Sequence, residues 1–166
     1  PRTPWRGFPH IIEGLRQVKE NLPEVEIVLF GDDLSKQDIP FDFRDEGIIM
    51  NQNKLAELYS AADVYLDGSD FQGFGRPALE AMACGAACVL TEVGGVTEYA
   101  RDEENCLLVP PKNPEDFAQA ILRIIQNKDV RTRLVRGGLE TVKDYCHKRE
   151  AQETLVYFRS ILISQS

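Results

Sequence analysis

The chain has 166 residues, of which 43% are hydrophobic and 28% charged, a balance typical of one ordinary globular domain. Its formal net charge of −8 argues against an extended surface for nucleic acid or for an anionic membrane, so any phosphate site must be local. No apolar run approaches the roughly 20 residues that span a bilayer, and residues 1–6 lack a signal-peptide pattern, so we expect a cytoplasmic protein.

The first third of the chain alternates helical and strand patterns. Apolar residues recur at helical spacing from Phe8 to Leu22, and residues 25–30 then predict a strand. A polar loop leads to residues 47–50, and a short helix over 55–62 follows. No strand pattern precedes Phe8, so the first strand of a regular sheet is expected to be missing from this chain.

The middle of the chain predicts further strands and helices in alternation. Strands are expected over 63–67, 86–91 and 106–109. Pro77 suits the first position of a helix that runs to Gly85, and residues 96–100 predict a short helix.

Three helices are predicted to close the chain. The first has Asn113 as its N-cap, the second starts near Asp129, and the third covers about 148–163. Strands separated by helices predict an α/β fold with a Rossmann-like parallel sheet and helices on both faces, in one domain over 1–166. Ligands in such folds bind beyond the carboxyl ends of the strands, which here precede the loops 31–33, 51–53, 68–76 and 92–95.

The loop before Pro77 has the features of an anion site. Gly73 and Gly75 let the backbone approach a ligand closely, and the following helix offers free N–H groups and a partial positive charge. The alternative is that the two glycines only make a tight connection.

Glu80 is the only charged side chain between Pro77 and Leu90. A carboxylate in such apolar surroundings needs a partner or an opening to solvent. A vicinal hydroxyl pair of a ligand would satisfy both oxygens, each charge-assisted bond contributing about 1.5–3 kcal/mol. Alternatively, Glu80 lies on the exposed stripe of its helix and is stabilised by the helix N-terminus.

The stretch from Ser69 to Gly85 resembles the donor-binding signature of family four glycosyltransferases, S-x-x-E-G-F-G-x-P-x-x-E-A-M-A-x-G, which contains the glutamate pair E-x7-E. Residues 91–98 are similar to the family's G-G-x-x-E turn. The resemblance implies the carboxyl-terminal, nucleotide-sugar-binding half of a retaining GT-B glycosyltransferase. It further implies that the helix over 148–163 crosses to an absent amino-terminal half, which holds a saccharide or lipid acceptor and any membrane contact.

The resemblance also assigns roles to particular residues. Glu80 matches the second glutamate, which binds the ribose hydroxyls of the nucleotide. The loop Gly73-Phe74-Gly75, followed by Arg76, matches the segment whose backbone amides face the donor sugar and diphosphate. Arg2 and Arg6 resemble the arginine and lysine that clamp the diphosphate, with arginine at position 6 changing the geometry of the cation. The alternative for both arginines is plain surface charge near a terminus.

Gln72 departs from the signature, because it stands where the first glutamate of the pair is expected. An amide keeps hydrogen bonding, adds a donor and removes the charge. Either the enzyme tolerates the change, as part of its sugar choice, or activity has been lost; we favour tolerance because the rest of the signature is intact.

The implied function is sugar transfer from a nucleotide diphosphate sugar in polysaccharide biosynthesis, with no cofactor. The chain has no Asp-x-Asp motif or histidine cluster, so no metal is expected. His10 and His147 are interpreted as helix surface residues, and the four cysteines as reduced core residues. Two alternatives stay open: a sugar-nucleotide epimerase of the same fold, and a non-catalytic flavodoxin-like binding domain.

Overall fold

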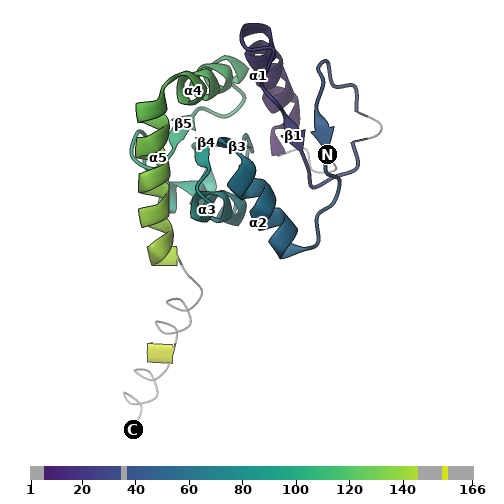
Figure 1. Cartoon of the computed structure of the whole chain (residues 1–166). Coiled ribbons are helices and arrows are strands. Elements are labelled where there is room, and N and C mark those ends of the chain that lie inside the picture. Colours follow the sequence, from purple (N-terminus) through teal and green to yellow (C-terminus); the bar gives the residue numbers. More distant parts are fainter. Residues whose placement is uncertain (1–5, 35–36, 146–154, 157–166) are drawn as a thin grey trace.

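The computed structural model describes residues 6–34, 37–145 and 155–156, in which short parallel strands alternate with helices (Figure 1). The strands are β1 (Val28–Leu29), β2 (Arg44–Asp45), β3 (Val64–Asp67), β4 (Ala87–Thr91) and β5 (Leu107–Val109). The α-helices are α1 (Phe8–Asn21), α2 (Gln52–Ala61), α3 (Arg76–Ala83), α4 (Pro114–Gln126) and α5 (Lys128–Thr141). Two 3-10 helices are η2 (Gly94–Glu98) and η3 (Val142–Tyr145).

All strand pairs are parallel, as predicted. β3, β4 and β5 form one sheet in that order, and β1 pairs with β2 separately. The sequence pattern does not predict β2, because both of its residues are charged and exposed. The helix predicted over 96–100 is a 3-10 helix displaced by two residues, η2.

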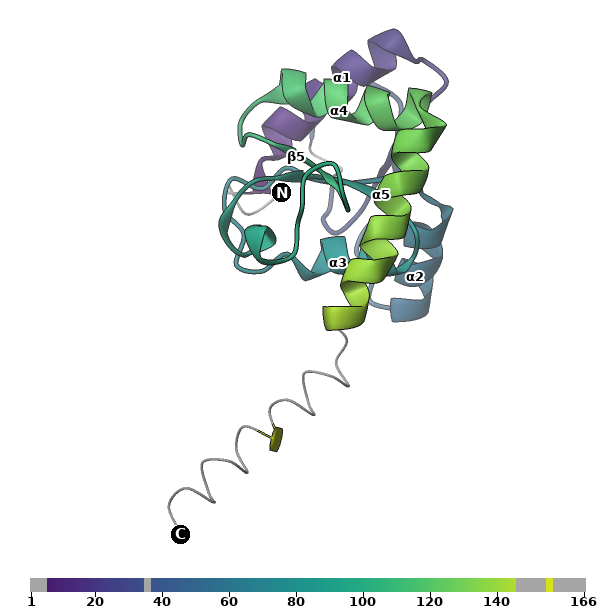
Figure 2. The same cartoon turned by 90° about the vertical axis from the view of Figure 1, so that its left-hand side faces the viewer.

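β4 is the centre of the fold, and every residue of it is buried. Ala87 and Val89 face one hydrophobic core, together with residues of α1, α4 and α5. Cys88 and Leu90 face a second core, together with residues of α2 and α3. Two perpendicular views show the same arrangement, with α1 and α4 on one side of the strands and α2 and α3 on the other (Figures 1 and 2). Helices therefore cover both faces, as expected.

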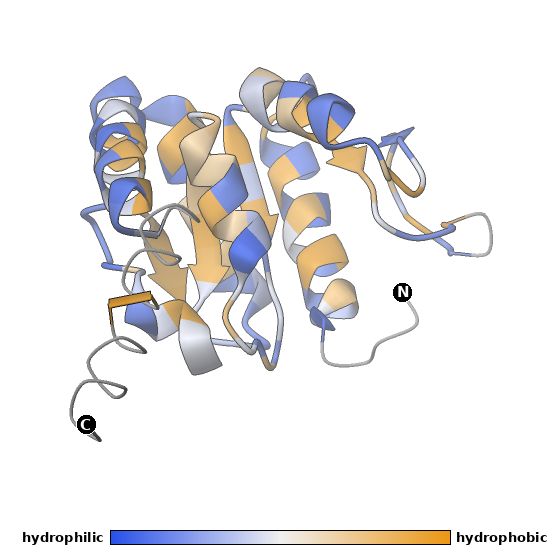
Figure 3. Ribbon diagram, turned by 90° about the horizontal axis from the view of Figure 1, so that it is seen from below, coloured by the Kyte–Doolittle hydropathy of each residue, from blue (hydrophilic) through white to orange (hydrophobic). Residues whose placement is uncertain are grey.

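The outer helices pack closely on each other and on the sheet. Gly14 in α1 permits this, because a Cβ there would lie 3.0 Å from the carbonyl oxygen of Pro114 and 3.2 Å from Cβ of Phe117 in α4. α5 contacts α3, α4 and β4, so it joins the two layers at one edge. Figure 3 shows the strands as mostly hydrophobic and the outer helix surfaces as mixed.

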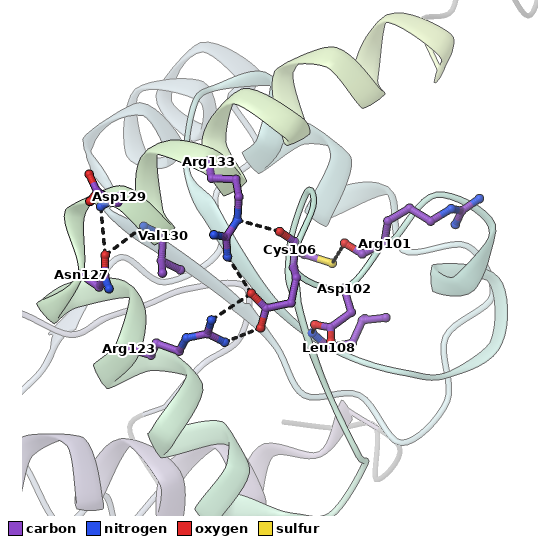
Figure 4. Close-up of polar contacts among 10 residues, drawn as sticks. Arg101, Asp102, Cys106, Leu108, Arg123, Asn127, Asp129, Val130 and Arg133 are labelled. Atoms are coloured by element: carbon purple, nitrogen blue, oxygen red, sulfur yellow. Dashed lines mark hydrogen bonds and ion pairs between the residues drawn. The ribbon is translucent and has the colours of Figure 1, made fainter.

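A charged cluster holds the turn before β5 against α4 and α5. The carboxylate of Glu103 accepts hydrogen bonds from Arg123 and Arg133, and Nε of Arg133 also donates to the Glu103 carbonyl oxygen at 2.8 Å. Figure 4 shows the two arginines converging on this carboxylate. Hydrogen bonds from Arg123 lower the pKa of Glu103 below its usual value.

The predicted closing helix over 148–163 lies almost wholly outside the described residues. Within it, Leu155 and Val156 are described and both are exposed. In the described part of the chain, no helix combines the length and apolarity required to cross a membrane.

Candidate functional site

The loop between β3 and α3 lies directly against the Gly94-Gly95 turn that follows β4. The amide of Gly95 donates to the carbonyl oxygen of Gln72 at 3.1 Å. A Cβ at Gly94 would lie 2.0 Å from that same oxygen, and a Cβ at Gly95 would lie 2.0 Å from the carbonyl oxygen of Gly73. Both turn glycines are therefore required by close backbone approach, which fixes the position of the loop.

Aromatic side chains that follow η2 and end η3 hold the loop in place. The ring of Phe74 packs against Tyr99 and Tyr145, at centroid distances of 5.6 and 5.9 Å. The Tyr99 hydroxyl donates to the carbonyl oxygen of Gly75 at 2.9 Å. Gly73 is exposed, and a Cβ there would meet nothing within 4 Å. The side chain of Phe74 therefore serves the core, while the backbone at Gly73 faces open space.

The structure brings Arg6 to this loop. The residue that follows it, Gly7, adopts φ of +64°, and a Cβ at Gly7 would lie 1.7 Å from the carbonyl oxygen of Gly68. Nη1 of Arg6 lies 3.5 Å from Oε1 of Gln72, a long hydrogen bond. Arg6 therefore lies beside the signature loop, and its role in binding a diphosphate stays a prediction. Arg2 lies outside the described residues.

Gln72 belongs to a buried polar network that sequence reasoning missed. Its Nε2 donates to Oδ2 of Asp67 at 2.7 Å. Oδ1 of Asp67 accepts from the amide of Ser69 at 3.0 Å and from its hydroxyl at 2.6 Å. Thr91 at the end of β4 donates to the Ser69 carbonyl oxygen at 2.6 Å. Asp67 and Thr91 are the last residues of β3 and β4, and Ser69 follows two residues after β3. Polar residues at the carboxyl ends of strands are a signal that could have indicated this network from the sequence.

Two helices near the loop begin without a side-chain cap. α1 and α3 start after Gly7 and Gly75, both in left-handed conformation, and neither has a capping side chain. In contrast, α2, α4 and α5 begin at Asn51, Asn113 and Asn127, whose side chains accept hydrogen bonds from the first turn. The second residue of each helix is a proline, which has no N–H, and the amides of His10 and Ala78 already donate to the carbonyl oxygens of Gly7 and Gly75. What these helix starts offer an anion is therefore the partial positive charge of the helix dipole.

Glu80 and Arg76 are both exposed on α3. Glu80 lies close enough to the buried Tyr59 of α2 to add to the effect of burial, and together they raise the pKa of that phenol. The opening to solvent that the isolated carboxylate requires is therefore present. The role of Glu80 in binding ribose stays a prediction.

The remaining titratable candidates lie away from this loop or have structural roles. Cys88 and Cys106 are buried and unpaired, and burial raises the pKa of Cys106 to about 12. His10 lies on α1 and is partly exposed, while Cys146 and His147 fall outside the described residues. Among residues 6–34, 37–145 and 155–156, no group of three or more His, Cys, Asp and Glu side chains could hold a metal.

A family profile for "Glycosyl transferases group 1" matches residues 2–141, which include the loop, Arg6 and Glu80. The chain belongs to this family. A D-inositol 3-phosphate glycosyltransferase from Saccharomonospora viridis is 37% identical over 108 residues, covering 65% of this chain and 25% of that protein. An uncharacterized glycosyltransferase from Methanocaldococcus jannaschii is 34% identical over 66% of this chain and 28% of its own length.

Solved structures show the same fold. Anabaena HepE in complex with UDP-glucose superposes with a TM-score of 0.82 at 21% identity, covering 95% of this chain and 46% of that one. The C-terminal domain of LpcC, a glycosyl transferase group 1 protein from Francisella tularensis, gives a TM-score of 0.74 at 25% identity over 85% of this chain and 80% of that one. The fold is therefore that of the carboxyl-terminal domain of GT-B glycosyltransferases. The chain spans about a quarter of the length of the curated relatives that it matches.

Proposed function

We propose that this chain is the donor-binding domain of a retaining glycosyltransferase, which holds a nucleotide diphosphate sugar beside the loop from Gln72 to Arg76. The family supplies the reaction class, and HepE, which shares the fold, was solved with UDP-glucose. The acceptor, a saccharide or a lipid-linked sugar, would be bound by an amino-terminal half outside this chain. The domain over 1–166 would then bind donor without transferring sugar by itself.

The arrangement of charge supports a diphosphate at this loop. Breaking the bond to the sugar's anomeric carbon leaves extra negative charge on the diphosphate, and preorganised positive groups stabilise that charge. Arg6, with Arg2 as a second predicted cation, and the partial positive charge at the starts of α1 and α3 supply such groups. We therefore propose that the transfer needs no metal or other cofactor.

Glu80 would hold the ribose at the other end of the nucleotide. It is exposed on α3, one turn beyond the uncapped start of the helix, so a nucleotide with its diphosphate at that start can reach it. Gln72 would contact the donor sugar, and its role in catalysis stays a prediction. Cytoplasmic location and a part in polysaccharide biosynthesis likewise stay predictions.

The single observation that carries this proposal is the close approach of Arg6 to the signature loop, which leads into α3, a helix that begins without a side-chain cap. The test is calorimetric titration of wild type and Glu80→Ala with UDP, GDP, ADP and dTDP. We expect one nucleotide to bind and Glu80→Ala to weaken it by about 1.5–3 kcal/mol, the size of a lost charge-assisted group. Glu57→Ala, an exposed glutamate on α2, is the matched control and should bind as wild type does. Equal affinity in wild type and Glu80→Ala would refute the assigned role.

A further inference from the structure

Gln72 lies between a group that only accepts hydrogen bonds and a group that only donates them. Asp67 is the acceptor, 2.7 Å from Nε2, and Arg6 is the donor, 3.5 Å from Oε1. A carboxylate has no proton to give and a guanidinium has no acceptor atom. Only one orientation of the Gln72 amide satisfies both neighbours, with its NH2 group toward Asp67 and its oxygen toward Arg6.

Asp67 is itself held in place. The amide and the hydroxyl of Ser69 both donate to its Oδ1, which leaves Oδ2 to face Gln72. Ser69 is 1% exposed, and its carbonyl oxygen accepts from Thr91, so the support beneath Asp67 is buried and satisfied. Gln72 is 9% exposed and its main chain is fixed by the Gly94-Gly95 turn.

We propose that Asp67 is a positioning residue that fixes the direction of the Gln72 amide, so that an uncharged acceptor stands where the family signature has a carboxylate. This inference rests on the proposed function only in naming the donor sugar as what that acceptor would meet. In this chain the negative charge lies on Asp67, the hydrogen-bond partner of Gln72, and not on residue 72 itself. Gln72→Glu alone then does not restore the family site, because it sets two carboxylates against each other at hydrogen-bonding distance.

The proposal predicts a specific pattern of rescue. In Asp67→Asn, the Ser69 donors keep the oxygen of the new amide at the Oδ1 position, so its NH2 group faces Gln72. Gln72 must then turn its own NH2 group toward Arg6, which is repulsive. In the double variant Asp67→Asn with Gln72→Glu, one oxygen of the new carboxylate accepts from the new amide and the other faces Arg6. The double variant therefore satisfies every group that either single variant leaves mismatched.

The test is urea unfolding of the whole chain, followed by circular dichroism, for wild type, the two single variants and the double variant. Asp42→Asn, at an exposed loop position, is the control for loss of one acidic charge. We expect each single variant to lower the folding equilibrium constant by about tenfold and the double variant to recover to within about threefold of wild type. A double variant whose loss equals the product of the two single losses would overturn the proposal.

A second measurement reports the amide direction itself. The side-chain NH2 signals of Gln72 in a 15N-correlated spectrum are identified by their absence in Gln72→Glu. We expect them to move in Asp67→Asn and to stay in place in Asp42→Asn. Unchanged Gln72 signals in Asp67→Asn would also overturn the proposal. Neither measurement uses a ligand, so failure here is distinct from failure of the nucleotide titration.

Discussion

The contact between the Gly94-Gly95 turn and the signature loop gives the sharpest structural prediction. In Gly95→Ala, the new Cβ would lie 2.0 Å from the carbonyl oxygen of Gly73, 2.8 Å from Cα of Phe74 and 2.9 Å from the carbonyl carbon of Gly73. All three atoms belong to the main chain, which cannot move aside as a flexible side chain does. The loop must therefore shift by about an ångström to reach ordinary contact distances.

The expected loss of stability follows from two effects. Overpacking costs about 1–3 kcal/mol, and weakening the hydrogen bond from the Gly95 amide to Gln72 costs about 0.5–1.5 kcal/mol more. We expect Gly95→Ala to lower the free energy of unfolding by about 2–4 kcal/mol, measured by urea unfolding. Gly73→Ala is the matched control, because its Cβ would meet nothing within 4 Å, and it should stay within about 0.5 kcal/mol of wild type. If the two variants were equally stable, the close approach of the two loops would be wrong.

Three further predictions concern other parts of the chain. Gly7→Ala should destabilise the fold and weaken nucleotide binding, measured by unfolding and titration, because its Cβ would lie 1.7 Å from the carbonyl oxygen of Gly68 and push Arg6 away. Glu103→Gln should cost less than about 1 kcal/mol at pH 7, since the carboxylate is partly exposed. Because the folded pKa of Glu103 is lowered, that difference should be present above the unfolded pKa of about 4.3 and disappear as pH falls through the folded pKa. At pH 8 the buried Cys88 and Cys106 should resist thiol reagents in the folded chain, as read by mass spectrometry, since burial raises both pKa values; labelling of Cys106 as fast as of the less buried Cys84 would contradict this.

Much of the fold can be predicted from the local spacing of apolar residues in the sequence. The uninterrupted apolar run of β4 predicts a strand buried on both faces, and the helical stripe that begins at Phe117 predicts the face of α4 that packs against α1. β2 does not follow, because Arg44 and Asp45 owe their strand geometry to pairing with β1 and not to their own character. β2 therefore depends on its contact with β1, which lies far from it in the sequence.

The site is predictable to a similar degree. The signature places Gln72 and Glu80 on one strand-loop-helix unit, and the resemblance extends this to Arg6. The strand-end position of Asp67 marks it as a candidate site residue, but its pairing with Gln72 does not follow from the sequence. Asp67 lies outside the signature, and the path of the loop brings the two side chains together. Sequence reasoning alone links the amide at position 72 to sugar choice or to lost activity, whereas the structure shows that this amide is also the hydrogen-bond partner of Asp67.

The most direct test of the donor-binding account is a 15N-correlated titration of the chain with UDP, GDP, ADP and dTDP. Two surface hollows compete as sites for an unspecific ligand, one along α2 around Glu57 and one between η2 and α5 around Asn105. The account predicts that one nucleotide moves the backbone amide signals of Gly73, Gly75 and Glu80 most strongly. Largest changes in either hollow, or no change with any of the four nucleotides, would contradict it.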